Sequence, residues 1–581
     1  MSAADGLLPA ARVAVAPEYK RRPAPQPIDL RLDANEGSPP DAAWLARALA
    51  GAGSVAQYPT AAELEAELAE RWGVTPDRVV VTAGADDAIQ RIVSGVIEPG
   101  RAAVITRPTF EMIDRDVMQA GGEVRAVPWM QGPLPVGAML SRLDGRAALV
   151  CVVSPNNPTG AAAARAELAQ LWAGTARAPV VRLLDAAYAE FADDDATAWA
   201  IEQPATVVTR TFSKAWGLAG LRVGYAVGDA RVIGWMRRVG QPYAVARTSI
   251  AVALAAHRER RAATEATARA VRAQRASLAG VLTGLGAQVV PSEANFVLAR
   301  PGGRGALVAQ LLAGLGIAVR RYDGHPELDG WLRIGCPGGA PEVGARVERA
   351  LRAAIAPEAL LLDMDGVIVD VSGSYRAAIA LTAESFGVRV TPEDVRAAKA
   401  AGNANNDWTL THRLVAAALG RAQGVPTLAE VTERFERLYQ GENGVAGLRH
   451  RESMLIDRGA LEGWAARMKL AVVTGRPRAD AERLIRERGL EGLFGAVVCM
   501  EDAPVKPDPA PVELALRRLG VSSAWMVGDT VDDVAAARAA GVVPVGCVAP
   551  GEAPERARAV LLGAGAGVVI DRLGELREIL P

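Results

Sequence analysis

This chain of 581 residues contains only four cysteines and four histidines, so its sequence gives little reason to expect a network of disulfides or a cluster of metal ligands. The cysteines lie far apart and form no Cys-x-x-Cys pair: Cys151, Cys336, Cys499 and Cys547. We expect them to be small buried side chains in a reducing cytosol. The histidines lack metal-ligand spacing and are predicted to be structural or to lie at the surface: His257, His325, His412 and His450.

An excess of one charge and a long apolar run are missing as well. Lys plus Arg number 65 and Asp plus Glu 66, so the net charge of −1 gives no reason to expect nucleic acid or an anionic membrane as a partner. No stretch of about 18 residues is both mostly apolar and free of charge, which argues against a transmembrane helix. Residues 1–10 lack a basic start followed by an apolar run, so we expect no secretory signal and a cytoplasmic location.

Short apolar runs alternate with amphipathic stretches across residues 40–245. These runs are rich in β-branched residues and predict buried strands at 79–81, 103–105, 149–153, 180–184 and 206–209. Strands that alternate with helices favour a mostly parallel sheet with helices on both faces. Residues 1 to about 30 are rich in Pro and Arg without periodicity and predict an extended arm.

The middle of the chain predicts helices and then a joint. Residues 246–285 lack strong turn signals and predict one long helix, and the mixed pattern that follows ends in a helix over 342–355. Pro357 stops that helix, and residues 360–362 begin a new strand. The joint contains no Gly/Ser linker, so we expect the two halves of the chain to abut.

One group of residues in the first half suits the chemistry of pyridoxal phosphate. That cofactor needs a lysine for an imine, a carboxylate for its protonated pyridine nitrogen, donors to its ring hydroxyl and an anion site for its phosphate. Candidates for these roles follow predicted strands or open a helix: Lys214, Asp185, Tyr188, Asn157, Ser213, Arg222 and residues 84–87. Taken singly, each suits a surface charge, a turn or a helix cap, but their joint occurrence in this order predicts a cofactor site.

In this order the motifs resemble those of the fold-type I aminotransferases, most closely histidinol-phosphate aminotransferase, over residues 15–355. The resemblance rests on the segments 32–36, 57–59, 108–110, 154–160, 185–191, 213–225, 294–296 and 332–334. It implies that Lys214 bonds the cofactor, that Asp185 pairs with the pyridine nitrogen and that Phe110 stacks on the ring. It also implies a homodimer in which the ring oxygen and the phosphate are held by Asn157, Tyr188, Ala85, Asp86, Ser213, Arg222 and, from the second subunit, Tyr58.

Two arginines are expected to bind substrate. By the same resemblance Arg333 holds the carboxylate of glutamate or 2-oxoglutarate, and Arg320 is either a second anion-binding arginine or a surface charge. The chain departs from the family at Gly37-Ser38, where Asn-Pro is usual, and at residues 242–246. Phospho-amino-acid decarboxylases and aromatic aminotransferases share much of the pattern, so the substrate stays open.

A second group of residues suits phosphoryl transfer. Asp363 and Asp365 follow a predicted strand, so one carboxylate can attack phosphorus while the other donates a proton to the leaving oxygen. Oxygen ligands for Mg²⁺ and partners for the phosphoryl oxygens follow other predicted strands or loops: Asp529, Asp533, Thr474 and Lys506.

These blocks resemble the haloacid dehalogenase superfamily phosphatases over residues 358–581. The resemblance implies that Asp363 forms an aspartyl-phosphate, that Asp365 is the general acid and base, and that Thr474 and Lys506 stabilise the transferred group. It also implies a Mg²⁺ site formed by Asp363, Asp365, Asp529 and Asp533, and an α-helical cap over residues 371–465. The cap segment 402–408 either contacts substrate or only caps a helix.

The sequence therefore predicts an α/β chain of two enzymes. A fold-type I aminotransferase occupies residues 1–355, with a large three-layer domain over about 40–245 and a small α/β domain from the N-terminal arm and about 246–355. A Rossmann-like haloacid dehalogenase domain with a helical cap occupies residues 356–581. The predicted activities are transamination between glutamate and imidazole-acetol phosphate, and Mg²⁺-dependent hydrolysis of a phosphate ester, with histidinol phosphate as the first candidate.

Other interpretations remain open. The aminotransferase could act on another phosphorylated or aromatic amino compound, and the phosphatase on an unrelated small ester such as phosphoglycolate. In a third interpretation the second half is a non-catalytic partner or dimerisation module.

Overall fold

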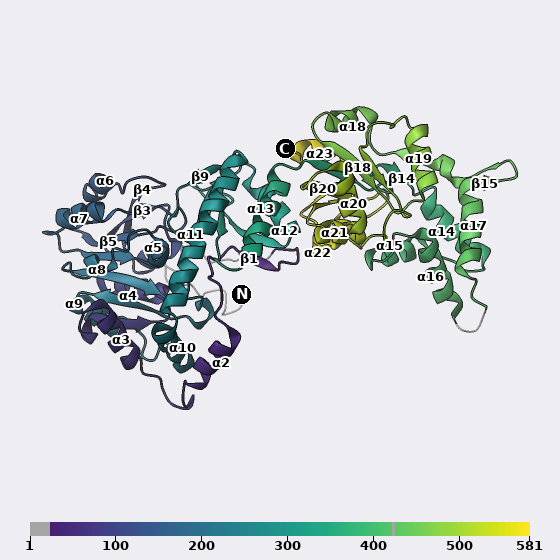
Figure 1. Cartoon of the computed structure of the whole chain (residues 1–581). Helices are drawn as coiled ribbons and strands as arrows, with labels where there is room; N and C mark the ends of the chain where they lie inside the picture. Colours follow the sequence, from purple (N-terminus) through teal and green to yellow (C-terminus); the bar gives the residue numbers. More distant parts are fainter. Residues whose placement is uncertain (1–23, 421–423) are drawn as a thin grey trace, which may run out of the picture. The chain divides into compact units, whose positions relative to one another are not determined.

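The computed structural model describes residues 24–420 and 424–581. The predicted N-terminal arm therefore lies for the most part outside the described residues. The chain divides into two compact units, drawn in Figure 1. The first contains residues 32–303 and 320–344, and the second contains residues 24–31, 304–319 and 345–581.

The first unit contains a seven-stranded sheet in the order β2-β8-β7-β6-β5-β3-β4. Its strands are β2 (Val79–Thr82), β3 (Ala102–Arg107), β4 (Glu123–Pro128), β5 (Ala147–Val153), β6 (Val181–Asp185), β7 (Thr206–Thr211) and β8 (Gly224–Gly228). Only β8 runs antiparallel to its neighbours among the pairings of this sheet. All the strands predicted here are present, whereas the polar β4 and the glycine-bounded β8 lack the continuous apolar run that marks the others.

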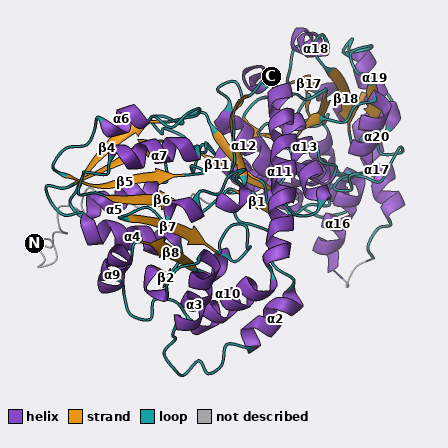
Figure 2. Ribbon diagram, turned by 60° about the vertical axis from the view of Figure 1, so that its left-hand side comes forward, coloured by secondary structure: helices purple, strands orange, loops and turns teal. Residues whose placement is uncertain are grey.

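Helices cover both faces of this sheet, with α6 and α7 on one side and α4, α5 and α9 on the other (Figure 2). Their bounds are α4 (Ala85–Val96), α5 (Glu111–Gln119), α6 (Val136–Leu140), α7 (Arg165–Gly174) and α9 (Ala230–Val239). One hydrophobic cluster joins the strands to α4, α5 and α9 through Ile89, Ile113 and Ile233. The predicted three-layer α/β/α architecture is thereby confirmed.

The single helix predicted over residues 246–285 is wrong, because two helices, α10 (Arg247–Glu259) and α11 (Arg261–Gly284), occupy this stretch. The backbone leaves the helical conformation at Arg260, with φ −115° and ψ 10°. The guanidinium carbon of Arg260 lies 4.8 Å from the ring centroid of Trp44, in the first turn of a distant helix, residues 42–50. A tertiary contact of this kind leaves no local sequence signal. Further helices of the unit are α2 (Ala42–Ala50), α3 (Ala62–Trp72) and α8 (Thr197–Ala200).

A smaller, five-stranded sheet has the order β1-β11-β12-β10-β9. Its strands are β1 (Leu30–Leu32), β9 (Gln288–Val290), β10 (Phe296–Arg300), β11 (Ile317–Arg321) and β12 (Leu332–Gly335). In the antiparallel pairing of β11 with β12, Arg320 lies directly opposite Arg333. Residues opposite one another on paired strands project from the same face, so the sheet brings the two predicted substrate arginines together.

The second unit contains a six-stranded parallel sheet in the order β19-β18-β13-β20-β21-β22. Its strands are β13 (Ala359–Leu362), β18 (Lys469–Val473), β19 (Ala496–Val498), β20 (Ala524–Gly528), β21 (Val543–Cys547) and β22 (Val568–Ile570). Its helices include α12 (Gly305–Gly314), α13 (Pro341–Ile355), α19 (Arg478–Glu487), α20 (Ala510–Leu519), α21 (Val531–Ala539), α22 (Pro554–Ala564) and α23 (Leu576–Ile579). As predicted, a helix ends just before Pro357 and a strand follows it. The fully buried indole of Trp525 donates a hydrogen bond of 2.7 Å to the carbonyl oxygen of Ala353, which ties α13 to β20.

A helical insert separates β13 from β18, in agreement with the predicted cap (Figure 1). Its helices are α14 (Tyr375–Ser385), α15 (Pro392–Ala400), α16 (Asp407–Leu419) and α17 (Leu428–Gln440), with a hairpin of β15 (Gly441–Glu442) and β16 (Val445–Ala446); a further helix, α18 (Arg458–Ala465), follows after the chain has returned to the core. The chain enters the insert through β14 (Val369–Asp370) and returns through β17 (Ser453–Met454), and these two short strands pair antiparallel. The insert is thus attached by a two-stranded ribbon.

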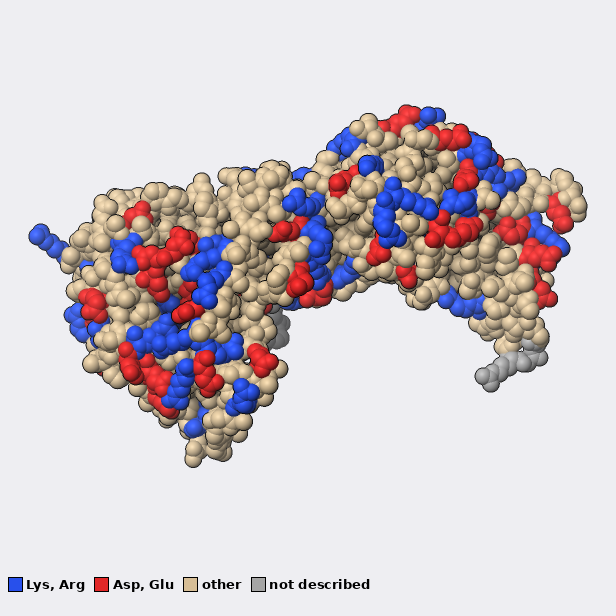
Figure 3. All heavy atoms as spheres, in the orientation of Figure 1, with Lys and Arg blue, Asp and Glu red and all other residues tan. Residues whose placement is uncertain are grey.

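Acidic and basic side chains lie interspersed on the face shown in Figure 3, as expected for a chain with a net charge of −1. None of the helices within residues 24–420 and 424–581 is long and apolar enough to cross a membrane. All four cysteines are free, and all four are buried, as predicted.

Candidate active sites

A cavity of about 580 Å³ lies at the carboxyl ends of the parallel strands of the first unit, where ligands bind in open α/β sheets. Nearly all residues predicted for the lysine site line it: Ala85, Asp86, Phe110, Asn157, Asp185, Tyr188, Ser213, Lys214, Arg222, Arg320 and Arg333. Tyr58 is the exception and lies at a separate, exposed position. Residues that were assigned to one site from the sequence therefore line one cavity, although they lie up to 248 positions apart, from Ala85 to Arg333.

Asp185 is the last residue of β6, and Lys214 follows the neighbouring strand β7. The Lys214 Nζ atom lies 3.2 Å from the carbonyl oxygen of Ala34 and 5.7 Å from the ring centroid of Tyr188. The carboxylate of Asp185 accepts hydrogen bonds from the Thr209 hydroxyl at 2.8 Å and from the Ala187 amide at 3.3 Å. Burial nevertheless raises the pKa of Asp185 to about 6, because these donors offset only part of the desolvation. A cationic group beside Asp185 would restore its charged form.

Amide and guanidinium groups line the wall of the cavity. The Asn35 side-chain amide donates a hydrogen bond of 3.1 Å to the Tyr188 hydroxyl. Arg333 donates to the Asn157 side-chain oxygen and, at 2.9 Å, to the Asp33 carbonyl. The Nε atom of Arg333 is buried without a hydrogen-bond partner in the described structure. A buried guanidinium with a spare donor suits an anionic ligand.

The start of α4 forms the other end of the cavity. Gly84 caps this helix with φ 87°, and a Cβ atom there would lie 2.7 Å from a terminal nitrogen of Arg222. Arg222 donates to the Asp86 carboxylate at 2.8 Å and lies 3.5 Å from the Ser213 hydroxyl. The helix N-terminus, the hydroxyl and the guanidinium together form a site where an anion could replace Asp86 as the partner of Arg222.

The predicted departure at Gly37-Ser38 is part of the wall behind Lys214. A Cβ atom on Gly37 would lie 2.0 Å from the carbonyl oxygen of Lys214, and one on Gly217 would lie 2.1 Å from the carbonyl oxygen of Ser38. The two backbones therefore contact each other directly. Side chains at these glycines would displace the loop that carries Lys214.

The second predicted departure, residues 242–246, lies beside Tyr58. The rings of Tyr58 and Tyr243 stack with centroids 4.5 Å apart, and the two side chains are 78% and 59% exposed. Tyr58 and Val55, which is 80% exposed, line a surface hollow of about 340 Å³. Exposed stacked aromatics of this kind are typical of an interface with another chain.

Some residues of the cavity carry no individual prediction: Asn35, Arg115, Tyr322 and His325. Asn35 lies within the motif 32–36, so its place in a conspicuous motif was the available signal. His325 is predicted to be structural or at the surface, yet it lines the cavity after β11, on a loop without a strand-end pattern. Its position depends on how the small sheet packs against the cavity, which local sequence does not reveal.

In the second unit Asp363 follows β13 and receives a buried cation. The Lys506 Nζ atom lies 2.7 Å from a carboxylate oxygen of Asp363, 2.5 Å from one of Asp533 and 3.0 Å from the carbonyl oxygen of Val473. Burial acts to lower the pKa of Lys506, but Asp363 and Asp533 outweigh it and raise that pKa. Burial also raises the pKa of Asp363, against the opposing effect of Lys506.

Three carboxylates converge here, because oxygen atoms of Asp363, Asp529 and Asp533 lie within 4.8 Å of one another. Opposite ligands of an octahedral Mg²⁺ are about 4.2 Å apart, so the spacing suits that ion. Burial and the neighbouring Asp533 raise the pKa of Asp529 to about 7, although Arg376 lies 3.6 Å from its carboxylate. The donor set therefore lacks positive charge that a divalent cation would supply. The carboxylate of Asp365, also predicted as a ligand, is not in this group.

Asp365 instead faces Arg476, whose Nε and terminal nitrogen both lie 2.6 Å from one of its carboxylate oxygens. Thr474, at the end of β18, accepts a hydrogen bond of 3.2 Å from the Arg476 amide through its hydroxyl oxygen. The structure thus brings Thr474 and Asp365 to the same strand edge as Asp363. It adds Arg476, which sequence reasoning did not single out although it follows Thr474 by two positions.

The cap segment 402–408 closes over this edge. The Asp532 carboxylate accepts hydrogen bonds from the amides of Asn403 and Ala404 at 2.8 and 2.9 Å, and Asn405 donates to the Lys506 carbonyl at 3.3 Å. A small cavity beside Asp365 is lined by Tyr375, Asn405, Asn406, Asp407, Trp408, Gly475, Arg476, Pro477 and Met500. The segment therefore both binds the core and forms the wall next to Asp365.

Comparison with known families supports both sites. Residues 27–351 match the model of the family described as aminotransferase class I and II, and residues 357–541 match that of haloacid dehalogenase-like hydrolase. Among curated proteins, the histidinol-phosphate aminotransferase of Dinoroseobacter shibae is 38% identical over 314 residues, which cover 52% of this chain and 86% of the relative.

Two further matches bear on fold and length. The imidazoleglycerol-phosphate dehydratase of Phytophthora nicotianae is 48% identical over 237 residues, which cover 39% of this chain. The chain spans about half the length of that relative, 52%. The solved structure of histidinol-phosphate aminotransferase from Sinorhizobium meliloti in complex with pyridoxal-5'-phosphate is 24% identical, with a TM-score of 0.50 over 56% of this chain and 92% of its own, and shows the same fold.

The raised pKa of Asp185 makes the stability of the ligand-free protein depend on pH. Its folded-state pKa of about 6 exceeds the ordinary 3.8, so the cost of charging it is absent below pH 3.8 and complete above pH 6. We expect Asp185→Asn to leave the urea midpoint nearly unchanged near pH 4 and to stabilise the protein by up to about 3 kcal/mol at pH 8. Asp193→Asn, at an exposed carboxylate, is the control. A gain that is the same at every pH would contradict the assignment.

Proposed function

The chain belongs to the aminotransferase class I and II family and carries a haloacid dehalogenase-like hydrolase domain, and from that premise we propose a bifunctional enzyme. It exchanges an amino group between glutamate and imidazole-acetol phosphate and hydrolyses a phosphate ester. The main observation behind this proposal is that one polypeptide contains both groups of residues. Lys214 and Asp185 line one cavity, and Asp363 lies with the carboxylates of Asp529 and Asp533 at the carboxyl edge of the second sheet. We place the domain boundary at residues 355/356, with large, small and cap parts as predicted, in a cytoplasmic protein.

In the first site the residues present fit pyridoxal phosphate, which, when bound, supplies the electron sink for amino-group exchange. Asp185 would hold the pyridine nitrogen, and the buried carboxylate, whose pKa is raised to about 6, would regain its charge there. Tyr188 and Asn157 would hold the ring oxygen, while Phe110 would cover the ring. The phosphate would take the place at the start of α4 lined by Ala85, Asp86, Ser213 and Arg222. The Lys214 Nζ atom is the group able to carry the proton that must move between carbons.

The paired arginines suit two substrates that carry different anionic groups. Arg320 and Arg333 lie opposite each other on β11 and β12, and both line the cavity. A planar guanidinium binds a carboxylate and a phosphate ester equally well. Glutamate presents the first group and imidazole-acetol phosphate the second, so one arginine pair would serve both half-reactions. The similarity to histidinol-phosphate aminotransferases supports this choice over an aromatic amino compound.

In the second site a carboxylate oxygen of Asp363 would attack phosphorus as the bond to the leaving oxygen breaks. Asp365 would give its proton to that oxygen, so an alcohol leaves and an aspartyl-phosphate remains. Asp365 would then take a proton from water as the water oxygen attacks phosphorus, which releases phosphate and restores both carboxyl groups. Lys506 and Thr474 would hold the transferred group, and Mg²⁺, bound by Asp363, Asp529 and Asp533, would supply positive charge.

The two activities are expected to be separable by single substitutions. Lys214→Ala should abolish glutamate formation from histidinol phosphate and 2-oxoglutarate, and Asp363→Asn should abolish phosphate release, each leaving the other activity within about twofold. Assaying glutamate and free phosphate in one incubation with pyridoxal phosphate and Mg²⁺ measures both. If Asp363→Asn released phosphate at the unchanged rate, the second half would not be the phosphatase, and the interpretation as a non-catalytic module would gain support.

The cavity beside Asp365 favours a cationic leaving alcohol. Its lining includes Asp365, Asp407 and the aromatic residues Tyr375 and Trp408, together with Arg476, whose guanidinium is bound on its two sides by Asp365 and Glu452. Burial raises the pKa of Asp407, although Lys399 lies 3.3 Å from its carboxylate and counteracts the effect. Carboxylates repel the carboxylate of phosphoglycolate, whereas they attract an ammonium group, and aromatic rings suit an imidazole. We therefore favour histidinol phosphate over phosphoglycolate.

This choice predicts a selective effect of Asp407→Asn. We expect kcat/KM for histidinol phosphate to fall about 10- to 100-fold, since a charged hydrogen bond contributes roughly 1.5–3 kcal/mol, while phosphoglycolate hydrolysis does not fall. Glu393→Gln, at an exposed carboxylate of α15, is the matched control and should change neither. Equal losses on both esters, or a wild-type preference for phosphoglycolate, would contradict the proposed substrate.

We also propose a homodimer that places Tyr58 beside the partner's cofactor phosphate. Tyr58 is 78% exposed, stacks on Tyr243 and lies outside its own chain's cavity, as a residue serving a partner would. Sedimentation should give twice the chain mass of 60.6 kDa. Tyr58→Phe should keep that mass but weaken pyridoxal phosphate binding about 10-fold, measured by absorbance titration, because one hydrogen bond to a charged group is lost. A monomer at micromolar concentration would overturn the proposal.

A further inference from the structure

We propose that Arg476 and Glu452 are positioning residues that fix the carboxylate of Asp365 relative to the two linkers of the cap. The inference rests on the proposed phosphatase activity of this domain. Glu452 does not line the cavity beside Asp365, whereas Arg476 lines it and contacts Asp365 directly. Their effect would be exerted through Asp365, which must donate a proton in one step and accept one in the next.

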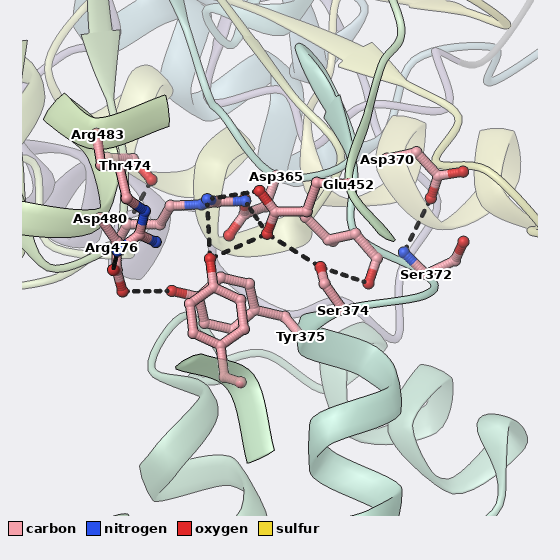
Figure 4. A network of polar contacts seen from close by, with 12 residues as sticks. Asp365, Asp370, Ser372, Ser374, Tyr375, Glu452, Thr474, Arg476, Asp480 and Arg483 are labelled. Carbon is pink, nitrogen blue, oxygen red and sulfur yellow. Dashed lines mark hydrogen bonds and ion pairs between the residues drawn. The ribbon is translucent and has the colours of Figure 1, made fainter. Parts of the chain in front are cut away.

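Arg476 is a fully enclosed cation that bridges two carboxylates (Figure 4). Its side chain is only 1% exposed, and its terminal nitrogens lie 3.1 and 3.2 Å from the carboxylate oxygens of Glu452. On its other side the same guanidinium lies 2.6 Å from Asp365. A rigid guanidinium with its donors committed on both sides allows the Asp365 carboxylate little freedom of orientation.

Glu452 anchors this bridge to both linkers of the cap. It lies immediately before β17 on the returning linker, and its side chain is 3% exposed. The hydroxyl of Ser374, immediately before α14 on the outgoing linker, donates to the Glu452 carboxylate at 3.0 Å. The hydroxyl of Tyr439, at the end of α17 in the cap, donates to the same carboxylate at 3.0 Å. One carboxylate therefore joins the outgoing linker, the returning linker and a cap helix.

Aromatic packing and a second polar branch keep the guanidinium in place. The ring centroid of Tyr375 lies 4.8 Å from the guanidinium carbon of Arg476, and its hydroxyl donates to the Asp480 carboxylate at 3.2 Å. Asp480 also pairs with Arg483 at 2.7 Å, on the far side of the network from Asp365 (Figure 4). Arg483 pairs with Asp480 and Glu487 and donates to Gln440, so it belongs to this second branch and offers a comparison site.

The arrangement couples cap position to the orientation of Asp365. A movement of either linker displaces Glu452, and Arg476 transmits the displacement to the carboxylate that handles protons. A shift of about 1 Å in a catalytic group can lower a rate about 100-fold. The cap would then have to adopt the arrangement seen here for Asp365 to work in either step.

The test uses full-length protein with Mg²⁺ and two esters that differ in their need for a proton. Release of p-nitrophenolate from p-nitrophenyl phosphate needs little protonation, whereas hydrolysis of the aspartyl-phosphate still needs Asp365 as a base. We expect Glu452→Gln to give a rapid burst of about one p-nitrophenolate per chain, followed by turnover about 10- to 100-fold slower than wild type, with a KM that falls together with kcat because the aspartyl-phosphate accumulates. With histidinol phosphate the burst should be absent, because the alkoxide cannot leave unprotonated.

Comparison variants separate positioning from folding. Asp365→Asn should reproduce the burst, and adding Glu452→Gln to it should cause no further loss, since both changes remove one function. Arg476→Lys, which keeps the charge but loses the paired donors, should resemble Glu452→Gln, while Arg483→Lys should behave as wild type. The thermal midpoint of each variant monitors folding.

Distinct outcomes overturn distinct statements. Unchanged turnover of both esters in Glu452→Gln and Arg476→Lys would overturn the positioning role. So would a burst amplitude that falls together with the thermal midpoint, because that result indicates a structural role alone. If the wild-type protein hydrolysed neither ester, the proposed phosphatase function itself would fail, and the failure would be visible before any variant is made.

Discussion

Parallel strands end at a common edge, and the groups on which both sites depend lie just beyond such ends. Asp185 ends β6 and Lys214 follows β7 in the first unit, and Asp363 and Thr474 follow β13 and β18 in the second. Buried parallel strands have satisfied backbones and mostly apolar side chains, so the polar groups of a binding site gather where the strands stop. The same constraint thus produces two chemically unrelated sites on one chain.

The buried carboxylates of the two sites have different kinds of partners. Asp185 has only neutral hydrogen-bond donors in direct contact, and burial raises its pKa to about 6. At the other site Lys506 is placed between Asp363 and Asp533, yet the pKa of Asp529 still rises to about 7. Each site therefore lacks positive charge that its proposed occupant would supply, a pyridinium in one case and a divalent cation in the other.

The strand ends could be predicted because a buried parallel strand is a continuous apolar run, and the residue after it is fixed by counting. That is why Asp363 and Asp185 were found from the sequence. Arg476 and Glu452 could not be paired this way, since their contact spans 24 positions and depends on how the cap linkers return to the core. His325 and the break at Arg260 likewise depend on packing between distant elements, which carries no periodic signal.

The hydrogen bond from Trp525 to Ala353 has a consequence for how the chain can be divided. Helix α13 lies largely within the stretch that matches the aminotransferase family, residues 27–351, yet it packs with the sheet of the second compact unit, as does α12. The boundary between the two enzyme families in the sequence therefore differs from the boundary between the two compact units. If the chain were divided at Pro357, the C-terminal fragment would expose the indole of Trp525, and the N-terminal fragment would carry α13 without the sheet on which it packs. The two halves therefore cannot be separated at the chemical boundary without exposing buried surface in both.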